Sequence, residues 1–232
     1  MQFAPLYPLL YRVLAPRFPS CLWSIDSSEP VVALTFDDGP HPEHTLQVLE
    51  VLEKFGIVAS FFSLGSCVRR YPDIAKAVFD GGHWMGLHGD THRSFPRLTL
   101  EELRLSLECN QLAIAEAIDR PLSWVQHRVR DVRPPNGLFT PPTLASLHRW
   151  NYRPVMWSVV PEDWVRPGVE KVVDRVLRQV RPGSLVVLHD GAFGGEDAAD
   201  TARSIIEELH RRTYRFVTID WLWQFKLCQP SG

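Results

Sequence analysis

The sequence lacks three features that mark common classes of protein. Its 4 cysteines are scattered over 232 residues without a Cys-x-x-Cys pair, so we expect no cysteine zinc site and no disulfides. The formal net charge of −2 gives no basic footprint, so we expect no nucleic-acid partner. No apolar run approaches the roughly 20 residues that cross a bilayer, so we expect no transmembrane span.

The N-terminal residues also lack the ordered basic, apolar and small-residue regions of a secretory signal. We therefore expect a cytoplasmic or membrane-peripheral protein, with export by another route as the alternative. One helical stripe near the N-terminus carries the apolar residues Leu6, Leu9, Leu10, Val13 and Leu14. With Arg12 and Arg17 nearby, the segment 6–17 could make a peripheral membrane contact. We favour the interpretation in which it packs against the domain as a lid or plug.

The rest of the chain alternates between strand-like and helix-like segments. Strands are predicted at about 31–36, 58–63, 83–88, 123–130, 152–159, 184–189 and 214–219. Helices are predicted at about 45–54, 71–80, 99–118, 140–149, 169–180 and 198–212, with a last one after Asp220. Thr99 and Glu102 have the spacing of a capping box. About seven strand–helix repeats favour an α/β fold, a distorted (β/α)7 TIM-like barrel, with residues 1–28 as a helical extension packed on one domain of residues 29–228.

Two adjacent carboxylates end the first predicted strand. Asp37 and Asp38 follow the apolar run 31–34 and precede a Gly-Pro turn. Like charges so close resist joint ionisation, and a bound cation would remove that difficulty. One carboxylate could then bind a metal while its neighbour handles a proton. The alternative is a solvated Asp-Asp-Gly turn.

A pair of histidines follows the third predicted strand. His88 and His92 would share one face of a helix or converge across a tight loop. Neutral imidazoles at this spacing are good zinc ligands, although surface histidine pairs are common. Together with Asp38 they would form a two-histidine, one-carboxylate site. Three protein ligands leave a position open for water, which is the pattern of catalytic metal sites.

The other candidate residues also lie near the carboxyl ends of predicted strands, where barrel enzymes place their chemistry. His189 is either a satisfied core histidine or a general acid, and Asp163 is its candidate carboxylate partner. Arg133 is either a surface arginine or a fixed guanidinium that orients a catalytic carboxylate. Trp164 is an apolar wall of the site or a core residue.

Five short motifs stand in one order along the chain. They are Thr35-Phe36-Asp37-Asp38-Gly39, His88 to His92, Arg133-Pro134-Pro135-Asn136-Gly137, Asp163-Trp164 and Val187-Leu188-His189. With them the chain resembles the polysaccharide deacetylase family, the NodB-like carbohydrate esterases of family 4, from about Val31 to about Ile219. The resemblance implies a distorted β/α barrel and makes residues 29–228 the catalytic domain.

The resemblance also implies a role for each matched residue. Asp37 would be the catalytic base, steadied by Arg133, and His189 the general acid, paired with Asp163. Three residues would hold a divalent metal ion, for which zinc is favoured: Asp38, His88 and His92. The backbone N–H of Asn136 would help to bind the oxyanion, and Trp164 would line the acetyl pocket.

Three positions depart from the family pattern. Gly89 stands where the family prefers Ser or Thr, Asn136 replaces an aromatic residue, and Val160 stands where many members carry an extra acidic residue. These changes leave the metal and proton-transfer groups intact but leave the substrate open.

The resulting hypothesis is a metal-dependent hydrolase that removes N-acetyl groups from a carbohydrate containing amino sugars. Peptidoglycan, a chitin-like polymer or another N-acetylglucosamine compound would be the substrate and partner. The alternatives are action on another C–N bond or on an O-acetyl ester, and a catalytically inactive carbohydrate-binding homologue.

Overall fold

The structure, a computed structural model, describes residues 4–228. Its parallel sheet has the strand order β5-β4-β3-β2-β1-β6, with β7 paired to the beginning of β1. The strands are β1 (Val31–Asp37), β2 (Ser60–Ser63), β3 (Trp84–Leu87), β4 (Asp131–Val132), β5 (Arg153–Pro154), β6 (Ser184–His189) and β7 (Arg215–Phe216). The sheet curls into a distorted β/α barrel, as the alternation of elements predicted.

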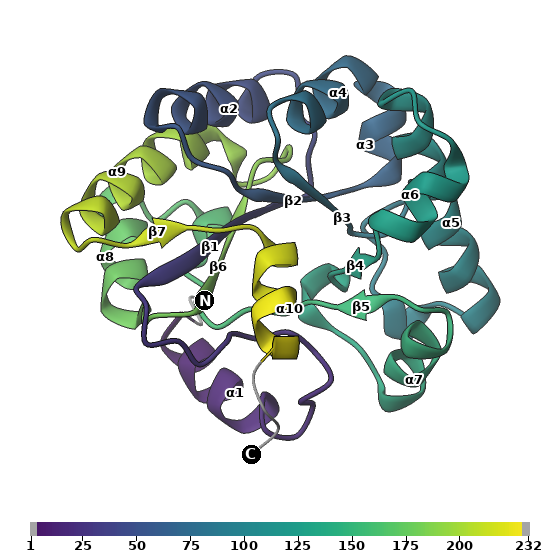
Figure 1. Ribbon diagram of the computed structural model, residues 1–232, viewed down its shortest axis with the longest axis horizontal. Helices are drawn as coiled ribbons and strands as arrows, with labels where there is room; N and C mark the ends of the chain where they lie inside the picture. The colour runs from purple at the N-terminus through teal and green to yellow at the C-terminus, as the bar shows by residue number, and fades with distance from the viewer. Residues whose placement is uncertain (1–3, 229–232) are drawn as a thin grey trace.

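Helices surround the sheet, and α10 lies across one end of it (Figure 1). The helices are α1 (Tyr7–Leu14), α2 (His44–Phe55), α3 (Gly65–Arg70), α4 (Pro72–Asp80), α5 (Leu100–Ala117), α6 (Leu122–Arg128), α7 (Pro141–Arg149), α8 (Val169–Gln179), α9 (Ala198–Arg211) and α10 (Ile219–Cys228). Among the described residues, none of these helices has the length and apolar character needed to cross a membrane.

The segment after β5 closes the barrel. Val159 forms a parallel bridge with Val186 of β6, so the chain spans the gap between the two outer strands of the sheet. Leu22, from the segment after α1, bridges Val155 and fills the same gap. The N-terminal segment is therefore part of the barrel wall.

Alternation along β1 separates the two hydrophobic clusters of the molecule. Val32, Leu34 and Phe36 belong to the cluster that packs under the outer helices, whereas Val31 and Ala33 belong to the cluster within the barrel. Because side chains alternate along a strand, Thr35 and Asp37 continue the inner row. The same pattern places Leu185, Val187 and His189 of β6 on the inner row.

Helix α1 packs on the barrel through a different face from the one predicted. Tyr7, Tyr11 and Leu14 contact the inner cluster, and the Tyr11 hydroxyl lies 2.7 Å from Ser24 Oγ. The other four members of the apolar stripe are exposed: Leu6, Leu9, Leu10 and Val13. The prediction that this stripe packs on the domain is therefore wrong for these four. The face with the tyrosines packs inward because it buries large aromatic rings, and the Tyr11 hydroxyl keeps a hydrogen-bond partner there.

The fourth strand lies elsewhere than predicted. Residues 123–130 fall mostly within α6, and the strand is the two-residue β4 that follows. Pro121 stands at the N-cap of this helix, and the buried residues Val125 and Val129 are four apart, as on one helical face. Short apolar runs do not distinguish helix from strand, which explains the error.

Candidate active site

The first strand delivers Asp37 to the interior of the barrel mouth. Asp37 is the last residue of β1, is 3% exposed, and lies in register with His189 at the end of β6. Because both belong to the inner row, both side chains line one cavity of about 600 Å³. The carboxyl ends of parallel strands therefore bring together two groups that are 152 positions apart, by their numbers in the sequence.

Arg133 fixes the Asp37 carboxylate. Its Nη1 donates to Asp37 Oδ1 at 2.6 Å and to Thr35 Oγ1 at 2.8 Å, and its Nη2 donates to the Met156 carbonyl at 3.0 Å. The guanidinium also lies 4.1 Å over the ring of Phe62. Burial lowers the pKa of Arg133, whereas the charge of Asp37 raises it. The interpretation as a surface arginine is wrong, since Arg133 is 1% exposed.

The position of Asp38 depends on close backbone packing. Asp38 has a φ of 74°, in the left-handed region that aspartate tolerates better than most residues. A Cβ atom at Gly191 would lie 2.5 Å from Asp38 Cβ, so only glycine fits there. The loop after β6 thus supports the turn that carries Asp38.

One hydrogen bond fixes the tautomer of His88. Its Nδ1 lies 2.7 Å from the carbonyl oxygen of Arg133, and a carbonyl only accepts, so Nδ1 carries the hydrogen. Burial lowers the pKa of His88 to about 3, although Asp38 opposes this shift. The ring is therefore neutral at pH 7, and its Nε2 presents a lone pair. A histidine ligand held through its other nitrogen by a backbone carbonyl is common at metal sites.

The structure brings Asp38, His88 and His92 together, across a loop rather than along a helix. Nε2 of each histidine lies 3.4 Å from Asp38 Oδ1, and the three donor atoms lie within 4.8 Å of one another. Asp38 Oδ1 is buried and has no hydrogen-bond partner among the described residues. A lone pair of neutral His88 facing an unpartnered carboxylate oxygen is unfavourable unless a cation lies between them. This donor set fits a divalent cation.

Asp163 orients His189 with both of its carboxylate oxygens. Oδ1 accepts from His189 Nδ1 at 2.9 Å, and Oδ2 accepts from the backbone N–H of His189 at 2.7 Å. Burial lowers the pKa of His189, but the charge and hydrogen bond of Asp163, together with Asp38 and Asp37, outweigh burial and raise it to about 9. The remaining ring nitrogen, Nε2, is left for substrate in the cavity that His189 lines.

Aromatic side chains form one wall of the cavity. The ring of Trp164, in the short helix Asp163–Val165, lies edge-on to His189 at 5.0 Å. Tyr7 of α1 lies edge-on to Trp164 at 6.2 Å and to Trp157 at 5.5 Å. Trp164 is therefore a wall of the site. The polar residue Asn136 also lines the cavity. Its φ is 60°, and its Nδ2 donates to Ser94 Oγ at 3.0 Å.

Sequence reasoning missed several residues of this cavity. Tyr7, Trp157 and Phe193 line it without belonging to any of the five motifs. Tyr7 had a signal, because it lies within the N-terminal helical segment, but nothing local connects position 7 with position 157. Phe193 follows the His189 strand by four positions and is 80% exposed at the rim.

Asp190 is a further missed residue, beneath the Asp37–Asp38 turn. Its backbone N–H donates to the Asp37 carbonyl at 3.1 Å, and its Oδ2 accepts from Thr45 Oγ1 at 2.5 Å. A Cβ atom at Gly39 would lie 2.5 Å from the same Oδ2. Burial raises the pKa of Asp190 to about 7, with Asp38 and Asp37 adding to the shift and Thr45 opposing it. Its place directly after His189 was the available signal.

These observations define a class of protein, a parallel β/α barrel with a candidate Asp-His-His metal site at the carboxyl ends of its strands. A sequence model described as polysaccharide deacetylase matches residues 24–155, which is more than half of the chain. The chain belongs to the polysaccharide deacetylase family.

Relatives and solved structures agree with this assignment. The chain is 32% identical over 206 residues to a peptidoglycan-N-acetylglucosamine deacetylase of Bacillus cereus, covering 88% of this chain and 93% of the relative. It is 39% identical over 160 residues to a chitooligosaccharide deacetylase of Rhizobium leguminosarum bv. trifolii, covering 69% and 71%. A crystal structure of a peptidoglycan N-acetylglucosamine deacetylase in complex with an N-oxidanyl-benzamide superposes with a TM-score of 0.81 at 27% identity, covering 87% of this chain and 92% of that one.

Proposed function

We propose that this protein is a metal-dependent hydrolase that removes N-acetyl groups from carbohydrates containing amino sugars, such as peptidoglycan or chitin-like oligomers. The proposal takes residues 29–228 as its catalytic domain and residues 1–28 as an extension of it. The named activities of the relatives support carbohydrate deacetylation. The single observation that carries the proposal is the convergence of Asp38, His88 and His92 beside the Arg133–Asp37 and Asp163–His189 pairs.

Asp38, His88 and His92 would hold the ion. The separation of 3.4 Å between each Nε2 and Oδ1 is close to the roughly 3.3 Å expected between two ligands of a tetrahedral ion with bonds of about 2.0–2.1 Å. Two imidazoles and one carboxylate favour zinc among the common divalent ions. When bound, such an ion supplies Lewis-acid activation of water and of the amide carbonyl.

Asp37 acts as the general base. Arg133 occupies its Oδ1, so Oδ2 is the oxygen that takes the proton from the attacking water. The guanidinium holds the carboxylate in one orientation throughout. The bond between Asp37 and Arg133 thus determines which oxygen is the base.

His189 acts as the general acid. Its Nδ1 is engaged by Asp163, so Nε2 carries the proton that passes to the amide nitrogen as the C–N bond breaks. Without that proton the amine is a poor leaving group. The products are acetate and a free amino sugar. Trp164 and Tyr7 would exclude water around the acetyl group, and the Asn136 backbone N–H would donate to the oxyanion, where one donor is worth about 10²–10³ in rate.

The test is acetate release by the purified protein with zinc, before and after chelation. Substrates are N-acetylglucosamine oligomers, peptidoglycan fragments and an O-acetylated oligosaccharide. Acetate from the N-acetyl substrates, lost on chelation and restored by zinc, is the expected result. Acetate from the O-acetylated sugar alone would assign esterase activity instead. Zinc binding at one ion per chain without any acetate would indicate an inactive carbohydrate-binding homologue.

A further inference from the structure

Helix α1 is apolar on two faces, and only one of them is packed. Tyr7, Tyr11 and Leu14 contact the barrel, through the face that carries the tyrosines. The outward stripe is 50% exposed at Leu6, 58% at Leu9, 43% at Leu10 and 41% at Val13. This spacing of three and four residues aligns the four side chains on one face. A helix that is apolar all round is normally buried on all sides, so the outward stripe lacks a partner within the described residues.

The charges around the stripe indicate what would cover it. Arg12 and Arg17 are both exposed, and they are the only charged residues in positions 1–25 of a chain whose net charge is −2. An apolar stripe flanked by arginines, without any acidic residue, complements an anionic lipid surface. A second copy of the chain fits less well, because a two-fold contact would bring these arginines close to their own copies without acidic partners. Four side chains also offer far less than the roughly 800 Å² per partner of a stable interface.

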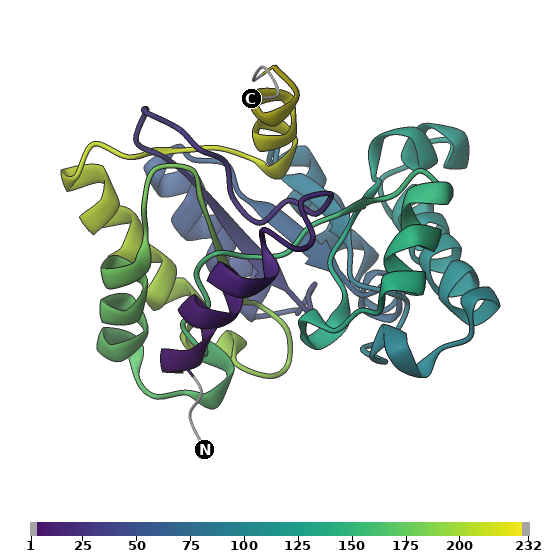
Figure 2. The same ribbon diagram turned by 90° about the horizontal axis from the view of Figure 1, so that it is seen from below.

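The position of α1 relates this surface to the active site. Tyr7, in the first turn of α1, lines the catalytic cavity together with Phe193, which is 80% exposed. Phe18, just after α1, lies edge-on to Phe139 of the loop that follows Asn136, at 4.9 Å. Figure 2 shows α1 in the foreground, with its N-terminal end directed to the lower side of the view. The apolar stripe therefore begins at the mouth of the cavity.

We propose that α1 docks on the surface of an anionic lipid bilayer through Leu6, Leu9, Leu10 and Val13, with Arg12 and Arg17 against the lipid phosphates. Docking places the edge of the cavity that Tyr7 lines next to the membrane surface. Its consequence for substrate, which rests on the proposed function, is that an N-acetylated sugar attached to a membrane lipid is deacetylated in preference to the same sugar in solution.

Sedimentation with vesicles tests the docking and needs no enzymatic activity. The protein is mixed with vesicles of phosphatidylcholine alone or with added phosphatidylglycerol. We expect binding to the anionic vesicles to be at least about tenfold tighter, since each arginine contributes about fivefold near an anionic surface. The double variant Leu9→Ser, Leu10→Ser should lose at least about tenfold of this binding, and Arg12→Gln, Arg17→Gln should remove the preference for anionic lipid.

A matched control uses exposed leucines at another place in the fold. Leu105 and Leu112 of α5 are 59% and 45% exposed, and the variant Leu105→Ser, Leu112→Ser should bind vesicles as the wild type does. All three variants should release acetate from soluble oligosaccharide at the wild-type rate. No binding of the wild type to anionic vesicles, or equal loss in the control, would overturn the docking. So would a wild-type dimer that the Leu9→Ser, Leu10→Ser variant dissociates.

The substrate consequence has its own readout. An N-acetylglucosaminyl lipid in anionic vesicles should be deacetylated at least about tenfold faster than the same soluble sugar at equal concentration. The Leu9→Ser, Leu10→Ser variant should lose this advantage and keep its rate on the soluble sugar. Equal rates for the wild type on both would overturn the consequence. Vesicle binding without acetate from either substrate would overturn the proposed function and leave the docking intact.

Discussion

Each end of the barrel holds a buried aspartate that is paired with an arginine. The two ends differ in how many hydrogen bonds their carboxylate oxygens accept. At the amino ends of the strands, Asp131 is fully buried and accepts four hydrogen bonds. The donors are Arg153 Nε (2.9 Å), Trp223 Nε1 (2.8 Å), Trp84 Nε1 (2.7 Å) and Arg153 Nη2 (2.7 Å). At the carboxyl ends, Asp37 receives one arginine bond, and neighbouring Asp38 Oδ1 has no partner among the described residues.

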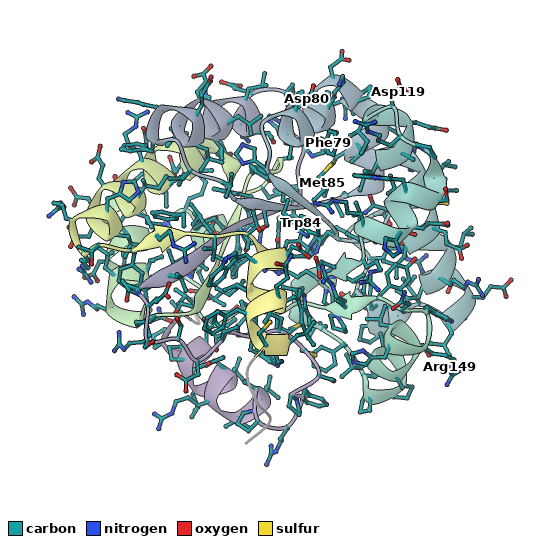
Figure 3. The ribbon with its side chains drawn as sticks, viewed as in Figure 1. Phe79, Asp80, Trp84, Met85, Asp119 and Arg149 are labelled. Carbon is teal, nitrogen blue, oxygen red and sulfur yellow. The ribbon has the colours of Figure 1, made fainter. Side chains whose placement is uncertain are left out.

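The difference shows how one fold separates stability from chemistry. The Asp131 network joins three strands to α10, and Figure 3, viewed from the α10 side, labels Trp84 at the beginning of β3. A fully satisfied buried network rigidifies the structure and leaves nothing for a ligand. Burying the Asp38 oxygen without a partner costs free energy. A cation that binds there would recover this cost, so this oxygen is the favoured place for a cation.

The largest expected effect is at Asp37, the proposed general base. We expect Asp37→Asn to lower kcat/KM for acetate release by about 10³–10⁴, because the amide does not accept the proton from water. Zinc affinity should stay within about threefold, since Asp37 is not among the three metal donors. The measurement pairs acetate release with competitive zinc titration.

Asp80 supplies the matched control for this change. It is an exposed aspartate at the end of α4, paired only with Lys76 on its own helix among the described residues and labelled in Figure 3. Asp80→Asn should leave acetate release unchanged within about twofold. Wild-type activity in Asp37→Asn would remove Asp37 from the role of base.

At the other end, Asp131→Asn should act on stability instead. The change removes the more buried of the two carboxylates that pair with Arg153, the other being Asp220, and places an amide against tryptophan donors. We therefore expect the free energy of unfolding to fall by about 3–5 kcal/mol. Urea denaturation measures the loss. The folded fraction should keep kcat within about twofold, and a large loss of kcat at unchanged stability would show that the two ends are coupled.

The two histidines that flank β3 compare the two ends of the barrel within a single strand. His88, after the strand, should be required for zinc: His88→Ala should weaken zinc binding by more than about 100-fold, because even outer contacts of metal ligands are worth 10–100-fold. His83, before the strand, accepts from the Ala59 N–H at 3.3 Å, and His83→Ala should leave zinc affinity within about twofold. Equal losses in the two variants would show that global unfolding, rather than ligand loss, weakens zinc binding.

Local signals in the sequence predicted the elements with the strongest patterns. The Thr99–Glu102 capping box is present, with both reciprocal hydrogen bonds, at the start of α5. The buried strands β1 and β6 were predicted to within a residue or two. A long apolar run that ends in Asp37 or His189 is typical of a buried strand. The two-residue strands β4 and β5 carry no such pattern, and pairing with their neighbours alone defines them.

The candidate site was predictable where motifs carry it and hidden where tertiary packing does. The residue types of Asp38 and His88, together with their positions at strand ends, are enough to predict that both lie at one edge of the barrel. Tyr7 lines the cavity because α1 packs against Trp157, and this contact joins residues that are 150 positions apart by their numbers. The hydrogen bond from Arg133 to one chosen oxygen of Asp37 depends on rotamers that a linear pattern does not record.

The smallest expected effect tests the acid at the catalytic end. As the proposed general acid, His189 would donate its proton only while protonated, so activity should be present below its pKa and lost as the pH rises through it. Asp163 raises that pKa, and Asp163→Asn should therefore move the alkaline limb of kcat/KM to lower pH by about one to two units. A cation held by Asp38 would lower the limb in both proteins and leave the difference between them. The asparagine oxygen can still accept from Nδ1 and orient the ring, whereas its amide NH2 replaces the oxygen that accepted from the His189 backbone N–H. An alkaline limb that stays in place would show that another group delivers the proton, and the contrast between the two ends would then rest on Asp37 and the metal donors alone.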